Sequence, residues 1–178
     1  MFQNLMLRRV SFLASTLVGI GGLAFAAPET SKTAAQVADL FQDARTTAGQ
    51  LKRDVMEMES YARSRVTWQA HSAQIMRIRE HVNKAGQLAA QLDKLRDGAE
   101  QWHQTAIDRL TPVLRELASN IESMIVHINK QTNMLDPTYD KYLKSNELLA
   151  SELSELISNT VEYDKTKAEM QKLEVAAK

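Results

Sequence analysis

The residues best suited to chemistry in this chain are its four histidines, because imidazole binds metals and exchanges protons near neutral pH. All four lie on or beside the apolar stripes of predicted helices: His71, His81, His103 and His127. We predict polar histidines that reach solvent, since a histidine at such a position has this simpler explanation. Metal ligation would need further side chains arranged around them.

One sequence pattern resembles part of a metal site. Glu100 and His103 form the only Glu-x-x-His pair in the chain. A di-iron site in a helical bundle uses two such pairs and two further glutamates. Glu100 also suits the start of a helix by its charge alone. We therefore predict no metal, although a bound metal would make Glu100, His103 and His71 the candidate ligands.

The sequence supports a haem site or a catalytic site no better than it supports a metal site. A haem in a bundle needs an axial histidine, and methionine can supply the second ligand. Methionines at helical spacing usually fill the core, however, and the chain has no cysteine for a C-x-x-C-H attachment. No serine has a recognisable nucleophile elbow or base, and no glycine-rich phosphate loop is present. The sequence predicts a non-enzymatic protein without a cofactor.

A cluster of basic residues surrounds a predicted turn, with Trp68 among them: Arg63, Arg65, Arg77 and Arg79. Trp and Arg are favoured at interface hot spots, so this cluster is a candidate docking surface for an anionic partner. The simpler interpretation is that the arginines pair with nearby glutamates and that Trp68 closes the end of the core. These glutamates would be Glu57, Glu59 and Glu80 or those of a neighbouring helix.

Four ladders of apolar residues at alternating spacings of three and four predict the helices that position these residues. The clearest is Ile107, Leu110, Leu114, Leu117, Ile121, Met124 and Ile128. The first is Val37, Phe41, Ala44, Ala48, Leu51, Val55, Met58 and Ala62. The second is Trp68, His71, Ile75, Ile78, Val82, Ala85, Ala89 and Leu92. The last is Tyr142, Leu149, Leu153, Leu156, Thr160, Tyr163 and Met170.

These ladders predict an all-α protein, an up-down-up-down antiparallel four-helix bundle of long helices. The rival is a long helical hairpin that dimerises. Turns are expected near 65–68, 97–98 and 136–137, the last because Asp136 can cap a helix and Pro137 can begin it. A single bent helix across 65–68 is the alternative at the first position.

Residues 1–26 resemble a secretory signal peptide. Arg8 and Arg9 precede an apolar run that ends in Ala24-Phe25-Ala26, with small residues at the −3 and −1 positions. We predict cleavage after Ala26, a short tether over 27–32 and a bundle domain over 33–178. An uncleaved membrane anchor is the alternative, and the arginine pair leaves both the Sec and the twin-arginine route open.

Composition limits the function classes further. Removing Arg8 and Arg9 from the 22 basic residues leaves 20 against 22 acidic residues, a net charge of −2. Such a balance gives no long-range field for nucleic acid. We expect an exported periplasmic or secreted protein, with no membrane span after cleavage, that binds a protein partner or itself. The alternative is an extracytoplasmic bundle that binds a metal or haem.

Overall fold

A computed structural model describes residues 27–64, 66–130, 133 and 135–177. These residues form four α-helices: α1 (Ala27–Arg63), α2 (Trp68–Leu95), α3 (Gln101–Lys130) and α4 (Pro137–Ala176). A short 3-10 turn, η1 (Arg96–Gly98), follows α2. The described part of the chain contains no strand, so the predicted all-α class is confirmed.

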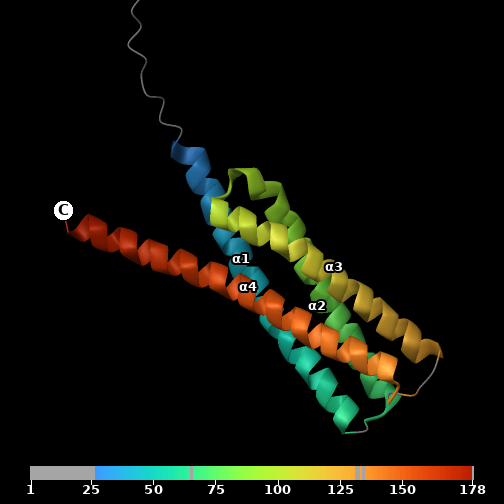
Figure 1. The fold of residues 1–178 in the computed structure, drawn as a ribbon. Helices are drawn as coiled ribbons and strands as arrows, with labels where there is room; N and C mark the ends of the chain where they lie inside the picture. The colour runs from blue at the N-terminus through green and yellow to red at the C-terminus, as the bar shows by residue number, and fades with distance from the viewer. Residues whose placement is uncertain (1–26, 65, 131–132, 134, 178) are drawn as a thin grey trace, which may run out of the picture.

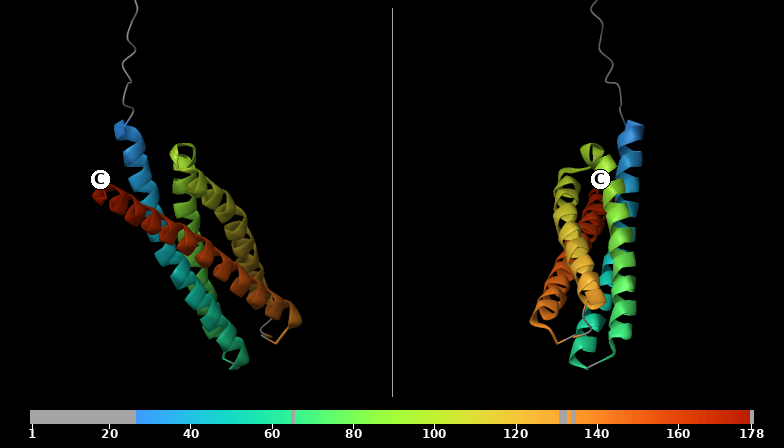
Figure 2. Two further views of the ribbon diagram at one scale, coloured as in Figure 1. Left: turned by 60° about the vertical axis from the view of Figure 1, so that its left-hand side comes forward. Right: turned by 90° about the vertical axis from the view of Figure 1, so that its right-hand side faces the viewer.

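Each helix packs on two neighbours. α1 and α3 each contact both α2 and α4, as in a four-helix bundle. The α1–α2 turn and the α3–α4 connection lie together at one end of the bundle, which we call the turn end, and η1 lies at the other, the corner end (Figure 1, Figure 2). One chain therefore supplies all four helices around a shared core.

The first three predicted stripes form most of this core. All seven apolar residues of the third ladder are buried, and so are seven of the eight in the first, with Ala62 partly buried. The second ladder is buried from His71 onward. Trp68 is the exception, because 43% of its surface is exposed and it does not close the end of the core.

The fourth ladder was predicted less accurately. Leu149, Leu153 and Thr160 are buried, but Tyr163 and Met170 are 53% and 58% exposed. An α-helix drifts about 20° per heptad from a strict seven-residue repeat, so a long heptad line leaves the core face of a straight helix. The stripe that α4 buries is Tyr139, Leu143, Asn146, Leu149, Ala150, Leu153, Ile157, Thr160 and Val161.

α4 also extends past the core. No residue after Val161 is buried in the described part of α4. In Figure 1 and in the left view of Figure 2, this C-terminal part crosses α1 and extends beyond the other helices. Tyr163 and Met170 lie on this extension, so their exposure follows from the length of α4 as well as from the drift of the heptad line.

The helix boundaries confirm all three predicted turns and correct one boundary. α1 ends at Arg63 and α2 begins at Trp68, so a turn separates them instead of a bend in one helix. Asp136 caps α4, because its Oδ1 atom accepts a hydrogen bond from the Thr138 amide at 2.7 Å. The predicted tether over 27–32 is wrong, since α1 already begins at Ala27.

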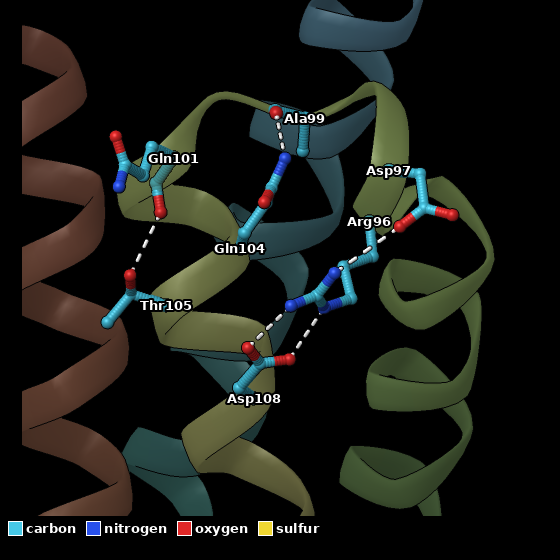
Figure 3. Close-up of polar contacts among 7 residues, drawn as sticks. All are labelled: Arg96, Asp97, Ala99, Gln101, Gln104, Thr105 and Asp108. Atoms are coloured by element: carbon cyan, nitrogen blue, oxygen red, sulfur yellow. Dashed lines mark hydrogen bonds and ion pairs between the residues drawn. The ribbon is translucent and has the colours of Figure 1, made fainter.

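The α2–α3 corner is fixed by one side chain of η1 (Figure 3). The Arg96 guanidinium donates two hydrogen bonds to the Asp108 carboxylate on α3, at 2.6 and 2.7 Å. This pairing lowers the pKa of Asp108. Gly98 follows, and a Cβ atom there would lie 3.3 Å from Thr33 Cγ2, so glycine allows α1 to approach the corner closely.

None of the helices in the described part of the chain is both long enough and apolar enough to cross a membrane.

We expect Leu117→Ala to lower the free energy of unfolding by about 2–5 kcal/mol, because it leaves a cavity at a fully buried position of α3. The matched control is Leu148→Ala on α4, where the leucine is 73% exposed and a change below about 0.5 kcal/mol is expected. Chemical denaturation followed by circular dichroism measures both values. Equal effects of the two substitutions would contradict the assigned core.

Candidate functional site

A chain of four aromatic rings, one from each helix, lies at the turn end. We call it the His71 ring chain: Tyr61 of α1, His71 of α2, Tyr139 of α4 and His127 of α3. Successive ring centroids are 6.0, 5.7 and 5.2 Å apart. His71 and Tyr139 have no exposed surface, and His127 is 8% exposed. These rings join all four helices where the core would otherwise meet water.

His71 is held as a neutral imidazole. Its Nδ1 atom lies 3.0 Å from the Tyr139 hydroxyl, and its Nε2 atom is buried without a hydrogen-bond partner among the described residues. Burial lowers the pKa of His71, and the Tyr61 backbone carbonyl offsets only part of this shift. Burial also raises the pKa of Tyr139, so its hydroxyl stays protonated. Two neutral polar groups therefore pair inside an apolar core.

A second chain of four rings, the His103 ring chain, lies toward the corner end: Phe41 of α1, His103 and Trp102 of α3, and Tyr163 of α4. Its successive ring centroids are 5.3, 5.1 and 5.1 Å apart. The Phe41 and His103 rings stack within the core, because both residues are buried. Trp102 and Tyr163 continue the chain toward the surface.

Asp164 of α4 ties this second chain together. One carboxylate oxygen accepts a hydrogen bond from Trp102 Nε1 at 3.0 Å, and the other accepts one from His103 Nε2 at 2.9 Å. Nearby, Lys167 lies 3.8 Å from the centroid of the Trp102 ring and pairs with Glu100 at 2.6 Å. These contacts attach α3 to α4 at the point where α4 begins to leave the bundle.

The prediction that the histidines reach solvent is wrong for three of the four. His71, His103 and His127 are buried, and each ring has a specific partner in α4 or in the α3–α4 connection. His81 is partly buried, and its Nε2 atom lies 3.0 Å from Asp54 of α1. A histidine on an apolar stripe can therefore be a core residue when a second polar side chain satisfies it.

Glu100 and His103 do not share a ligand. Glu100 pairs with Lys167, whereas His103 pairs with Asp164. His71 belongs to the other ring chain, so the three candidate ligands are not gathered around one point. Among the described residues, no three His, Asp or Glu side chains are grouped to hold a metal ion.

The basic cluster at the α1–α2 turn is largely paired. Arg63 pairs with Glu59, Arg77 lies 3.8 Å from Glu57, and Arg79 lies 3.2 Å from Glu122 of α3. Arg65 lies outside the described residues. Exposed ion pairs of this kind are weak and open easily. Docking through Arg63, Arg65, Trp68, Arg77 and Arg79 therefore stays a prediction, while the ion pairs agree with the simpler interpretation.

A groove of about 680 Å³ runs between α3 and α4. Trp102 and Tyr163 lie along it, together with Leu156 and the exposed Leu148. Its polar lining includes Arg109, Glu152 and Glu155, and Arg109 lies 3.6 Å from Glu152. His103 does not line the groove, so the His103–Asp164 pair fastens two helices and is not presented to a molecule in the groove.

Our sequence reasoning missed Trp102, Tyr139 and Asp164. Asp164 follows Ile157 by seven residues, so an acidic side chain falls on the stripe that α4 buries. An acid at such a position needs a donor, and the adjacent Trp102 and His103 are two unused donors at the start of another helix. The acid on α4 and the two donors on α3 could together have predicted this contact. Recognising the acid, however, required knowing which stripe of α4 is buried.

We expect Asp164→Ala to lower the free energy of unfolding by about 1–3 kcal/mol, because it leaves the Trp102 and His103 donors without their acceptor. Asp97→Ala is the control, since the Asp97 side chain is 98% exposed. Thermal unfolding measures stability, and tryptophan fluorescence in a Trp68→Phe background, where Trp102 is the remaining tryptophan, reports the local change. A stability loss no larger than that of the control would show that Asp164 does not fasten α3 to α4.

Comparison of the chain with protein-family models, curated proteins and solved structures finds no match. A four-helix architecture by itself is shared by proteins of many functions. The proposals below therefore rest on the residues and contacts of this chain.

Proposed function

We propose that this is an exported, non-enzymatic helical protein that binds an amphipathic helix of another protein in the groove between α3 and α4. The observation that supports this best is a line of accessible apolar side chains along α4. Leu148, Tyr163 and Met170 are 73%, 53% and 58% exposed, and the half-buried Leu156 lies between the first two. An exposed line of apolar side chains promotes aggregation unless a partner covers it, so such a line often marks an interaction site.

The spacing of this line suits a helical partner. Leu148, Leu156, Tyr163 and Met170 follow one another at intervals of eight, seven and seven residues, so they lie along one side of α4. Amphipathic helices dock by placing apolar residues of similar period into a groove. Trp102 and Tyr163 are the aromatic anchors expected of an interface centre. The groove would accept the apolar side chains of the partner helix while its backbone stays outside.

The charges around the groove indicate the polar side of the partner. Glu155 makes no ion pair among the described residues, and Arg109 engages Glu152 only at 3.6 Å. Two carboxylates against one guanidinium leave an acidic edge on α4. A partner helix with Lys or Arg beside its apolar residues would complement this edge.

Export is supported by the sequence of residues 1–26, with its arginine pair, apolar run and Ala-Phe-Ala ending. We propose that the partner is therefore encountered outside the cytoplasm.

The binding proposal predicts that a photo-crosslinking amino acid at Leu148 gives an adduct with another protein in intact cells. The matched control is the same amino acid at Met56 of α1, which is 49% exposed and lies outside the groove. Leu148→Asp should weaken the partner's affinity at least tenfold by placing a charge in an apolar contact, whereas Met56→Asp should not. An adduct between two copies of this chain, or equal adducts from both positions, would contradict binding of another protein here.

The export proposal predicts that N-terminal sequencing of the protein from cells begins at Ala27-Pro28-Glu29. Cell fractionation should place this product outside the cytoplasmic fraction. A full-length chain that still carries Met1 and sediments with membranes would support the anchor alternative instead.

A further inference from the structure

Each of the four helices supplies one ring to the turn end, and His71 lies inside that chain of rings. Tyr61 is in the last turn of α1, His71 in the first turns of α2, and Tyr139 at the start of α4. His127 lies in the last turn of α3, and its Nε2 atom is 3.3 Å from the backbone carbonyl of Asn133. A change in the position of His71 therefore affects the contacts that hold the α1–α2 turn and the α3–α4 connection together.

Apart from the Tyr61 backbone carbonyl, which offsets only part of the effect of burial, His71 has no described group that would stabilise a positive charge. The ionisable rings that contact it are Tyr61 from α1 and Tyr139 from α4, and His127 from α3 lies beyond them, against Tyr139. Two acids at this end are engaged by other groups: Glu57 of α1 accepts a hydrogen bond from Tyr61 at 2.7 Å, and Asp136 caps α4. Among the described residues no carboxylate forms an ion pair with His71. A proton on His71 would thus be a buried charge without a counter-charge.

The hydrogen bond to Tyr139 also opposes protonation. A neutral imidazole accepts the phenol proton at one ring nitrogen, but an imidazolium carries a proton on both nitrogens and accepts none. The Tyr139 hydroxyl would have to turn to accept, and its own proton would then need another acceptor in a fully buried site. Moving His71 toward water removes both costs.

The other ring chain differs because it contains an acid beside its histidine. His103 donates to Asp164 at 2.9 Å, and the ionised carboxylate can balance a charge on the imidazole. The two buried histidines therefore differ in one respect that matters for acidification: one faces a phenol and the other faces a carboxylate.

We propose that the His71 ring chain is a pH-sensitive latch: protonation of His71 opens the turn end of the bundle while the corner end stays closed. The latch is independent of partner binding in the α3–α4 groove.

The direction of the effect follows from proton linkage. Burial lowers the pKa of His71 in the closed form, so the open form binds the proton more tightly. The closed form is fully favoured above the ordinary histidine pKa of about 6.5 and loses stability as the pH falls below it. As the pH falls, the equilibrium constant for opening should rise by up to tenfold per pH unit until the pH reaches the pKa of His71 in the closed form. This slope corresponds to the uptake of one proton.

Hydrogen exchange measured by mass spectrometry on the full chain tests this proposal. After correction for intrinsic exchange rates, residues 68–78 of α2 and 137–146 of α4 should lose protection between about pH 7.5 and about pH 5. Residues 101–110 of α3, at the other end, should keep theirs. Protection that is unchanged with pH at the turn end, or that falls equally at both ends, would overturn the latch.

Matched substitutions assign the response to one histidine. His71→Gln keeps a neutral hydrogen-bonding side chain and should abolish the pH dependence, whereas His103→Gln and His127→Gln should leave it in place. Retention of the response in His71→Gln, or its loss only in His127→Gln, would overturn the proposal. If His71→Gln does not fold, NMR titration of the histidine rings in the wild-type protein tests the proposal instead. The His71 signal should titrate over the same pH range in which protection is lost. Titration of His71 without opening of the turn end would also overturn the latch.

Discussion

The apolar core of a four-helix bundle is open at both ends, so its stability depends on side chains that close those ends against water. Here two chains of four rings do so, one through His71 and one through His103. For the Trp102–Tyr163 pair, such a geometry contributes about 0.5–1.5 kcal/mol beyond its buried area. Polar atoms within the rings then need local partners, which Tyr139 supplies to His71 and Asp164 supplies to Trp102 and His103.

The two closures use different chemistry. At the turn end a neutral imidazole pairs with a neutral phenol, and both are fully buried. At the other end Asp164 receives donors from Trp102 and His103, and the neighbouring Lys167 covers the Trp102 ring. The first arrangement depends on pH because it has no counter-charge. The second accepts a charge and can lie close to a surface that is open to solvent.

The length of α4 connects this second closure to the proposed binding groove. α4 has 40 residues, whereas α3, its neighbour across the groove, has 30. Because α4 crosses the bundle and extends past it, its side chains near Tyr163 are only partly covered (Figure 2). Asp164 and Lys167 fasten this part of α4 to the start of α3 through Trp102, which also lines the groove, so contacts that close the core also define one end of the groove.

Local sequence patterns were sufficient to predict the helices, their turns and most of the core. The spacing from Ile107 to Ile128 specifies a buried stripe whatever its partners are, and the Asp136-Pro137 pair specifies a helix start because capping is a local interaction. The bundle was predicted to begin at residue 33, six residues after the observed start of α1 at Ala27.

The roles of the histidines and the correct face of α4 were decided only by the tertiary structure. Each of the pairs His71–Tyr139 and His103–Asp164 joins residues more than 60 positions apart, so no local spacing encodes them. α4 carries two neighbouring apolar lines, and its sequence alone does not show which one faces α1 and α3. Packing against those helices selected the line from Tyr139 to Val161 and left the other exposed along the groove, because a helix surrounded by neighbours on one side can bury only one face.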